Sequence, residues 1–460
     1  MSVTETIREA LRGTERDLTS IPVGRAVALL AIPAVVEMFM ESLFAIVDIF
    51  WVSKLGSNAV AVVGLTESML AIVYAAAVGL SAGATALVSR RIGEGDKEGA
   101  SRAVVQILGV GVAVAIVVGF AGAVLAPHLL SLMGGSSEVV RAGTGYTSVM
   151  LGGSVTVLLL FLINAVFRGA GDAAIAMRVL WLANGLNIVL GPLFIFGIGP
   201  FPELGVMGAA VGTTIGRGVG VLYQLYVLVR GRGRIAIGAR HLAFDRDVMR
   251  RFLGLSGGGT LQSLVETTSW IGLIRILASF GSAALAGYTI AIRIALFALL
   301  PSWGIANAAA TLVGQNLGAI RPDRAERSVW VAGGWNLAFL GSISIFFVAA
   351  PGFFVGLFSP EASTVPYAVD CLRIVALGFL FYAYGLVVVM AFNGAGDVRT
   401  PMLLNLACFW ALKIPVAWVL AVPLGLGPRG VFIAIAVAYS TLAVVSALLF
   451  KRGRWKLQQV

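Results

Sequence analysis

Charged residues, cysteine and histidine are scarce in this sequence, and each scarcity excludes a class of protein. Only 12% of the 460 residues are charged and 59% are hydrophobic, with a mean hydropathy of +0.95. Soluble domains carry about 25% charged residues, which excludes a soluble globular protein. Cys371 and Cys408 both lie in apolar segments, so neither a disulfide framework nor a thiolate metal site is expected. His128 and His241 fall in expected loops, and the sequence therefore predicts no metal site, no cofactor and no enzyme activity.

What the sequence has instead is a series of apolar runs, each long enough to cross about 30 Å of hydrocarbon. The alternating segments of about ten residues that build a membrane β-barrel are missing. We therefore expect an all-α integral membrane protein with twelve transmembrane helices. The polar first twenty residues lack the apolar core of a cleaved signal peptide, so the first span itself should direct insertion. The expected spans are 26–52, 59–88, 103–126, 142–167, 179–199, 207–229, 252–277, 285–312, 328–350, 367–391, 401–423 and 430–450.

The second half of the chain repeats the first at a constant offset of 225 residues. Glu41 falls on Glu266, and the polar run Gly-Ala-Gly-Asp at 169–172 falls on the same run at 394–397. Two copies of an apolar unit are typical of transporters that work between two halves. Six spans per half give both copies one orientation, so we expect two pseudo-symmetric six-helix bundles with a cleft between them. The expected divisions are a segment 1–25, an N-lobe 26–229, a linker 230–251, a C-lobe 252–450 and a basic tail 451–460.

Basic residues in the loops gather on one side of the expected membrane. The opposite loops hold only Lys54, Arg141 and Arg429, whereas both ends of the chain and the linker are rich in Arg and Lys. The positive-inside rule therefore places both termini and the linker in the cytoplasm, with the chain as a multi-pass protein of the plasma (inner) membrane. This topology accounts for the net charge of +11. Because no aromatic residues are interleaved into a basic face, nucleic acid is not an expected partner.

Three carboxylates lie in the first expected span. At 100° per residue, Glu37, Glu41 and Asp48 fall on one stripe about 40° wide. Charges in the bilayer interior are expensive, so two interpretations remain. The stripe either pairs with intramembrane basic residues or lines a cavity and binds H⁺ or another cation, and like charges one turn apart raise the affinity for a proton. The candidates for such pairing are Arg217, Arg275, Arg293, Arg373 and Lys413.

The internal repeat distinguishes among these three carboxylates. Only Glu41 is kept as an acid in the second copy, as Glu266, whereas Glu37 becomes Gln262. The halves therefore share a carboxylate at equivalent depth without being functionally symmetric. We expect cation coupling at Asp48, Glu41, Glu37, Glu266 and Asn187. We expect a substrate cavity lined by Asn184, Gln262, Tyr382 and Tyr384.

The sequence motifs and their order along the chain resemble those of the multidrug and toxin extrusion (MATE) transporters. These form a family of the multidrug/oligosaccharidyl-lipid/polysaccharide flippase superfamily. The resemblance covers essentially the whole chain. The matching features are Pro33 early in the first span, Asp48 before Lys54-Leu55-Gly56, residues 167–172 with their echo at 393–397, the run 184–192 (NGLNIVLGP), and Glu266 fifteen residues before Gly281.

The resemblance implies antiport of organic, often cationic, compounds out of the cell, driven by H⁺ or Na⁺ and working by alternating access. Asp48 and Asn187 match an N-lobe proton site in one branch of the family, and Glu266 matches a C-lobe Na⁺ site residue in another. Gly191 stands where the first branch carries an Asp, which leaves the coupling ion open. Our hypothesis is that the Glu37/Glu41 pair replaces the missing carboxylate.

One alternative within transport is a flippase for a lipid-linked precursor. Such a cavity needs cationic residues for phosphate, whereas the visible stripe is acidic and suits small organic cations. The expected partners are therefore a small organic cation, the coupling ion and the lipid bilayer, with the protein as a monomer.

Overall fold

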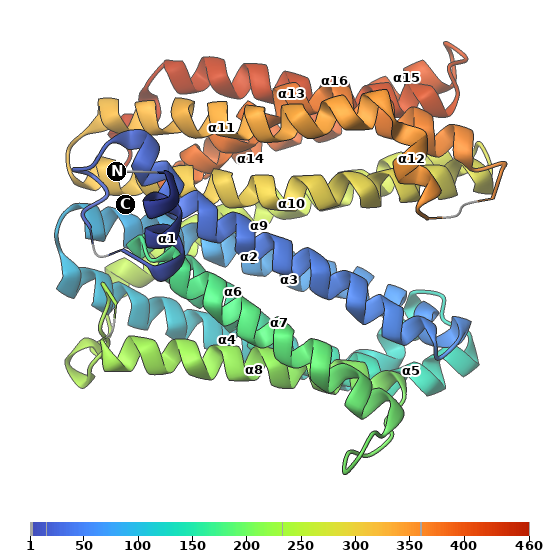
Figure 1. Ribbon diagram of the computed structural model, residues 1–460, viewed down its shortest axis with the longest axis horizontal. Coiled ribbons are helices and arrows are strands. Elements are labelled where there is room, and N and C mark those ends of the chain that lie inside the picture. The colour runs from blue at the N-terminus through green and yellow to red at the C-terminus, as the bar shows by residue number, and fades with distance from the viewer. Residues whose placement is uncertain (1–2, 15, 232, 359–360, 460) are drawn as a thin grey trace.

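The computed structural model describes residues 3–14, 16–231, 233–358 and 361–459, and within these ranges all regular structure is helical (Figure 1). Polar side chains cap several helix starts, as Asp96, Ser136 and Asp245 do by accepting hydrogen bonds from backbone N–H groups. The helices of the first half are α1 (Val3–Arg12), α2 (Val23–Ser53), α3 (Ser57–Gly93), α4 (Lys97–Leu132), α5 (Ser137–Gly152), α6 (Ser154–Ala170), α7 (Ala173–Phe196) and α8 (Val206–Arg230). Those of the second half are α9 (Arg246–Ala278), α10 (Ser282–Gly318), α11 (Pro322–Ala349), α12 (Pro351–Gly356), α13 (Val365–Ala395), α14 (Arg399–Asn405), α15 (Ile414–Ala421) and α16 (Pro428–Lys451). A π-helical segment, Leu406–Lys413, joins α14 to α15, and two 3-10 turns lie at Ala239–His241 and Arg454–Leu457.

The described chain has ten helical spans that are long and apolar enough to cross a membrane. One of these spans consists of α5 and α6, and another extends from α14 to α15. Two more, α8 with 25 residues and α9 with 33, are long enough but carry inward-facing polar groups such as Arg217 and Glu266. Together they make the twelve spans and six per half that the sequence predicts, and the all-α two-lobe fold is confirmed.

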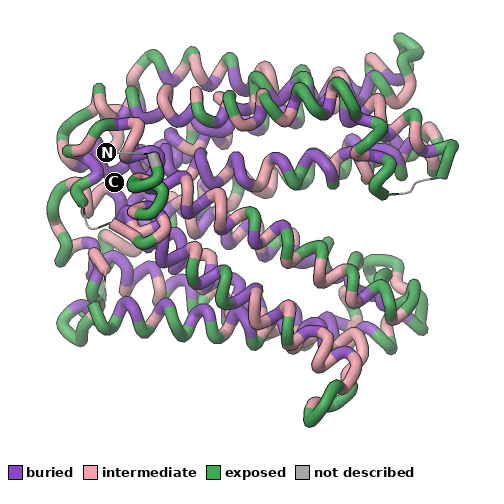
Figure 2. Tube along the Cα trace, in the orientation of Figure 1, coloured by how far each residue is buried: buried purple, intermediate pink, exposed green. Residues whose placement is uncertain are grey.

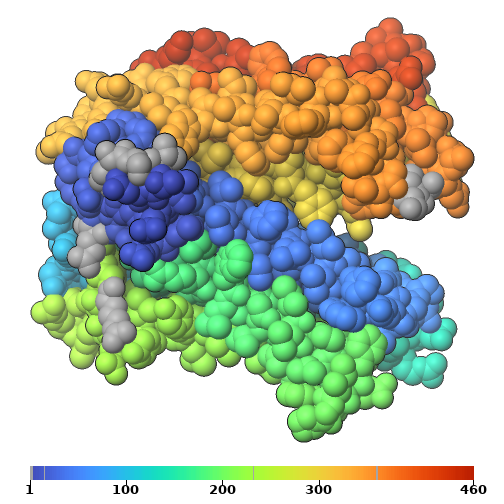
Figure 3. Space-filling view, in the orientation of Figure 1, coloured from blue at the N-terminus to red at the C-terminus, as the bar shows by residue number. Residues whose placement is uncertain are grey.

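The two halves diverge from one end of the molecule, where both termini lie (Figure 1). α2 packs against α7 of its own half and α10 of the other, and α3 packs against α6 and α9, so these helices tie the halves together. The space-filling view shows the lobes separated at the end away from the termini (Figure 3). The molecule is therefore closed at the end that carries the termini and open at the opposite end.

The outer surface of the bundle is apolar and its interior holds polar groups. Large hydrophobic side chains such as Ile72, Phe120 and Leu222 are exposed, whereas Asn184, Arg217 and other polar residues are buried. Figure 2 shows exposed and buried residues alternating along the long helices. A soluble protein shows the reverse pattern, and lipid provides the environment that these outer faces require.

Small residues allow the helices of one lobe to approach closely. On α8, a Cβ added to Gly208 would lie 2.5 Å from the backbone of Phe194, and one added to Gly216 would lie 2.5 Å from the carbonyl oxygen of Ala183. Glycine at these positions thus sets the contact between α7 and α8, as expected where lipid supplies no hydrophobic drive.

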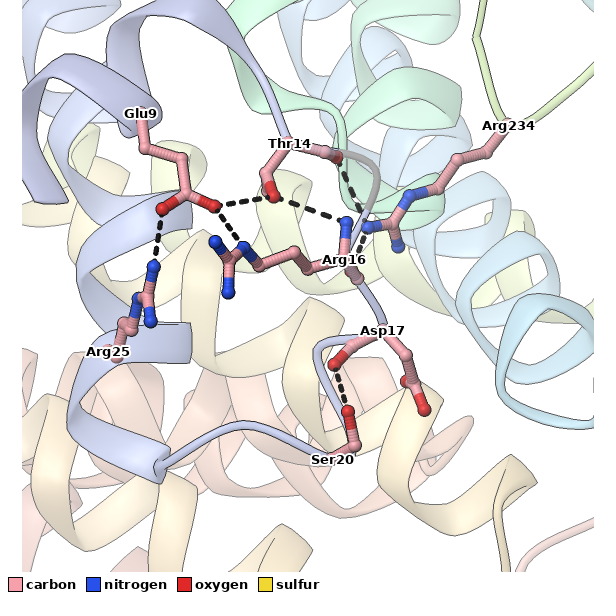
Figure 4. Close-up of polar contacts among 7 residues, drawn as sticks. All are labelled: Glu9, Thr14, Arg16, Asp17, Ser20, Arg25 and Arg234. Carbon is pink, nitrogen blue, oxygen red and sulfur yellow. Dashed lines mark hydrogen bonds and ion pairs between the residues drawn. The ribbon is translucent and has the colours of Figure 1, made fainter.

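Hydrogen bonds and ion pairs hold the segment that joins α1 to α2 at the closed end (Figure 4). The Glu9 carboxylate accepts from Arg25 at 2.5 Å and from Thr14 at 3.0 Å, and it pairs with Arg16 at 2.7 Å. Burial alone would raise the pKa of Glu9, but hydrogen bonds from Arg25 and Thr14, with the charges of Arg25 and Arg16, outweigh burial and lower it. Glu9 is therefore held as a carboxylate.

Arginines from both halves donate to backbone carbonyl groups of the same segment. Arg178 of α7 donates to Arg12, and Arg234 of the linker donates to Thr14 and Arg16. From the other half, Arg321 donates to Thr19 at 2.7 Å and Arg324 donates to Leu18 at 3.1 Å. The N-terminal segment thus bridges the two lobes at the closed end.

Candidate functional site

A cavity of about 270 Å³ lies between the lobes and is lined by both of them. Among the residues that the structure describes, its charged lining residues are three carboxylates and one guanidinium. They are Glu37 and Glu41 of α2, Glu266 of α9, and Arg168 of α6. Further polar lining groups are Asn164, Gln262, Tyr382, Asn393 and Tyr439. Acidic residues that the sequence places in separate halves therefore line one site.

Glu37 forms a buried ion pair with Arg168. Their closest atoms, Glu37 Oε1 and Arg168 Nη1, lie 2.7 Å apart, and Asn164 donates to the same oxygen at 3.2 Å. Gln224 of α8 in turn donates to Asn164 at 2.6 Å. This geometry supports the pairing interpretation for Glu37.

The basic partner of Glu37 is not among the five candidates that the sequence suggested. The expected fourth span ended at residue 167, so Arg168 was assigned to a cytoplasmic turn, whereas α6 continues to Ala170 and directs this side chain inward. An amide within an apolar run, Asn164, was the signal that this helix face lines a cavity. The sequence reasoning missed both residues.

Glu41 is held by different partners. Asn184 of α7 donates to Glu41 Oε2 at 2.9 Å, and Arg217 Nη2 lies 3.7 Å from Glu41 Oε1. Arg217, one of the expected candidates, also donates to Tyr74 at 3.2 Å. Asn184 is buried and does not line the cavity. It contacts the site through its hydrogen bond to Glu41.

Asp48 and Asn187 lie further along the N-lobe. The charges that act on Asp48 are those of Glu67 and Arg217. The Asn187 amide donates to Thr213 of α8 at 2.6 Å and is buried. A Cβ added to Gly191 would meet Asn187 Oδ1 at 4.0 Å and nothing closer, so a side chain fits beside this amide.

In the C-lobe, Glu266 accepts a hydrogen bond from the Tyr439 hydroxyl at 3.1 Å. The ring of Tyr382 lies edge-on to Tyr439, with ring centres 5.0 Å apart. These three residues and Trp303 also line a second cavity of about 500 Å³ inside the C-lobe, which is rich in aromatic rings. Gln262 and Tyr382 line the central cavity, and their contact with substrate stays a prediction.

Tyr384, like Asn184, lies outside the lining of the central cavity, contrary to the expected position. Its ring lies 6.1 Å from that of Trp330 and packs over Gly333 of α11, on the side of α13 away from Tyr382. Residues two apart on a helix point about 200° apart, so Tyr382 and Tyr384 cannot face one cavity.

Both lobes match a known protein family. The sequence model of the MatE family matches the chain twice, over residues 33–193 and 260–419, once in each half. The chain belongs to the MatE family. The two matches follow the internal repeat, and the resemblance drawn from the sequence motifs is confirmed.

MATE relatives match this chain over most of its length. A probable multidrug resistance protein NorM of Thermotoga maritima is 27% identical over 94% of this chain and 93% of its own. An FAD transporter of Shewanella oneidensis is 26% identical over 87% of this chain and 88% of its own. A solved outward-facing conformation of a multidrug resistance MATE family transporter of the MOP superfamily superposes with a TM-score of 0.89, at 26% identity, over 95% of this chain and 97% of that chain.

This MATE protein is therefore a multi-pass membrane transporter of the multidrug efflux type, and not an enzyme. Its substrates are small organic compounds.

Proposed function

We propose that this MATE transporter exports organic cations in exchange for H⁺ or Na⁺ by alternating access. The observation that carries the proposal is the charge of the central cavity, where three carboxylates face one guanidinium. A cavity with an excess of negative charge in a low-dielectric surrounding attracts cations by electrostatic complementarity. With both termini in the cytoplasm, as the positive-inside rule requires, the cavity would open to the outside in this conformation.

The coupling groups in this proposal are Asp48, Glu41 and Glu266, with Asn187 as a neutral neighbour. A carboxylate in the membrane needs a countercharge or a proton, and either the substrate cation or the coupling ion can supply one. Binding of H⁺ or Na⁺ from the outside would then release the substrate cation. Moving one elementary charge across 100 mV supplies about 2.3 kcal/mol for the exchange.

Glu37 has a different part in the proposal. Because Arg168 already neutralises it at 2.7 Å, Glu37 would hold Arg168 in place and contribute to coupling indirectly. The same pair argues against a flippase for a lipid-linked precursor, since the one guanidinium lining the cavity is engaged by a carboxylate and not free for phosphate.

The test is efflux of a fluorescent organic cation from liposomes that contain the purified protein. A pH gradient and a Na⁺ gradient are imposed separately, on wild type, Glu41→Gln and Glu266→Gln. We expect efflux under one gradient, reduced at least about tenfold when a carboxylate that holds the coupling ion is neutralised. Absence of efflux under both gradients would contradict the proposal, and movement of a labelled lipid-linked phosphate would favour the flippase.

A further inference from the structure

A buried lysine lies in an aromatic cage in the C-lobe. The Lys413 ammonium is 4.2 Å from the ring centre of Trp270, 4.6 Å from that of Phe409 and 5.8 Å from that of Tyr439. It donates a hydrogen bond to the Ser269 hydroxyl at 2.8 Å, and the residue is fully buried. Rings at these distances stabilise a cation by cation–π attraction, so the cage is built for a positive charge.

The cage lies next to Glu266. Ser269 and Trp270 follow Glu266 by about one turn of α9, and Tyr439 belongs both to the cage and to the carboxylate, to which it donates at 3.1 Å. The charges of Glu266 and Lys413 act on each other, yet no ion pair within 4.0 Å joins them among the described residues. Lys413 therefore neutralises the site without occupying the carboxylate.

The local helix geometry brings Lys413 to this position. Lys413 ends the π-helical segment, and Pro415 follows two residues later. Proline has no N–H to donate and crowds the preceding turn, which favours a widened turn there. Such π-segments occur frequently at functional sites.

The N-lobe has different residues at the positions of this cage, and there the guanidinium of Arg217 lies 3.7 Å from the equivalent carboxylate, Glu41. At the repeat offset of 225 residues, Lys413 corresponds to Ile188, Trp270 to Ala45 and Tyr439 to Thr214. The cage is therefore not required by the repeated architecture, although the carboxylate itself is present in both halves as Glu41 and Glu266.

We propose that Lys413 is a tethered cation that keeps Na⁺ out of the Glu266 site, so that this carboxylate exchanges protons and not sodium ions. This role deepens the antiport proposed above and depends on it. A metal ion bound at Glu266 would lie in the same pocket as the ammonium group, since Tyr439 contacts both residues, and like charges in a low-dielectric interior repel strongly. A proton adds to the carboxylate itself and needs no further oxygen ligands.

The remaining ionisable groups of this pocket do not compete for the role. Tyr288 of α10, Tyr382 of α13 and Arg293 of α10 line the C-lobe cavity together with Glu266 and Tyr439. The two tyrosines are neutral near pH 7, and the charge of the arginine acts on Glu67 of α3, whereas the charge that acts on Glu266 is that of Lys413.

The first experiment measures equilibrium binding of radioactive Na⁺ to the purified full-length protein in detergent, with choline chloride keeping the ionic strength constant. We expect no Na⁺ binding at Glu266 in wild type, so that wild type and Glu266→Gln bind Na⁺ alike. Lys413→Met, which keeps the length of the side chain and removes its charge, should bind Na⁺ at least about tenfold more tightly, because one neighbouring charge shifts an ionic equilibrium by one to three decades. The gain should disappear in Lys413→Met combined with Glu266→Gln.

The matched control is Lys54→Met, which removes an ammonium that also sits over aromatic rings, 4.7 Å from the ring centre of Phe50, but outside the lining of both cavities. It should behave as wild type. A folded Lys413→Met with unchanged Na⁺ binding would overturn the proposal.

The wild type provides a second test that does not depend on the folding of any variant. The part of its efflux that depends on Glu266 should follow the pH gradient and ignore the Na⁺ gradient. Saturable Na⁺ binding or Na⁺-driven efflux that wild type shows and Glu266→Gln lacks would overturn the role of Lys413. Loss of efflux under both gradients would instead refute the antiport, while the binding assay, which needs no transport, still decides whether Lys413 excludes Na⁺.

Discussion

At the scale of single residues, Glu37 and Arg168 show how a membrane cavity tolerates charge. The pair is buried at 2.7 Å, and the repeat replaces it in the C-lobe by Gln262 and Asn393, which line the same cavity. Equivalent positions of the two lobes thus carry a charged pair in the N-lobe and a neutral pair in the C-lobe. Removing one partner of a buried pair costs about 3–5 kcal/mol, because the other charge is left uncompensated.

We therefore predict that Glu37→Gln lowers the thermal stability of the protein markedly, whereas Glu37→Gln with Arg168→Asn, the pair found in the C-lobe, recovers most of the loss. Thermal unfolding in detergent, followed by tryptophan fluorescence, measures both. A double variant as unstable as the sum of the two single variants would show that the pair adds nothing beyond its separate contacts.

A second prediction concerns Gly191, where a side chain fits beside Asn187. If Glu41 stands in for an acid that Gly191 lacks, Gly191→Asp should restore part of the efflux lost in Glu41→Gln, by returning a carboxylate to the N-lobe. Gly191→Asn in the same background controls for size and polarity. Equal efflux with Asp and Asn, or none with either, would contradict the hypothesis that Glu41 replaces the acid missing at position 191.

At the scale of elements, the segment between α1 and α2 joins the lobes at the closed end (Figure 4). Its contacts come from arginines of both halves and from Glu9, which pairs with Arg16 and Arg25. The lowered pKa of Glu9 determines the sign of the pH effect. A carboxylate whose pKa falls on folding contributes stability at pH values above its ordinary pKa, and the contribution is lost as the pH falls through the lowered value.

We predict that Glu9→Gln destabilises the closed end at neutral pH by about 1 kcal/mol or less, as is usual for pairs near a surface. The difference from wild type should vanish in acid, below the lowered pKa of Glu9. Melting temperatures of both proteins from neutral to acidic pH provide the measurement, with Glu203→Gln, at an exposed position, as a control. A difference that persists unchanged in acid would mean that Glu9 acts through packing.

At the scale of the whole molecule, the sequence determined the architecture more fully than the site. Apolar length and the constant offset between Glu41 and Glu266 predicted the spans and the repeat, because both signals are carried by many residues at once. The site depended on single helix ends and faces. Placing the end of α6 a few residues early hid Arg168, and Tyr384 was wrong because its face of α13 is set by packing against α11. The caged position of Lys413 depends on α9 and α16, which lie far from it in sequence.

The central claim is that an organic cation and the coupling ion compete for the carboxylates of one cavity between the lobes. The most direct measurement is the affinity of the purified protein for tetraphenylphosphonium as a function of pH and, separately, of Na⁺ concentration. Because linkage is reciprocal, we predict that affinity falls as one of these ions is raised, and that the dependence is weakened in Glu41→Gln or Glu266→Gln. An affinity that changes with neither ion would contradict the claim.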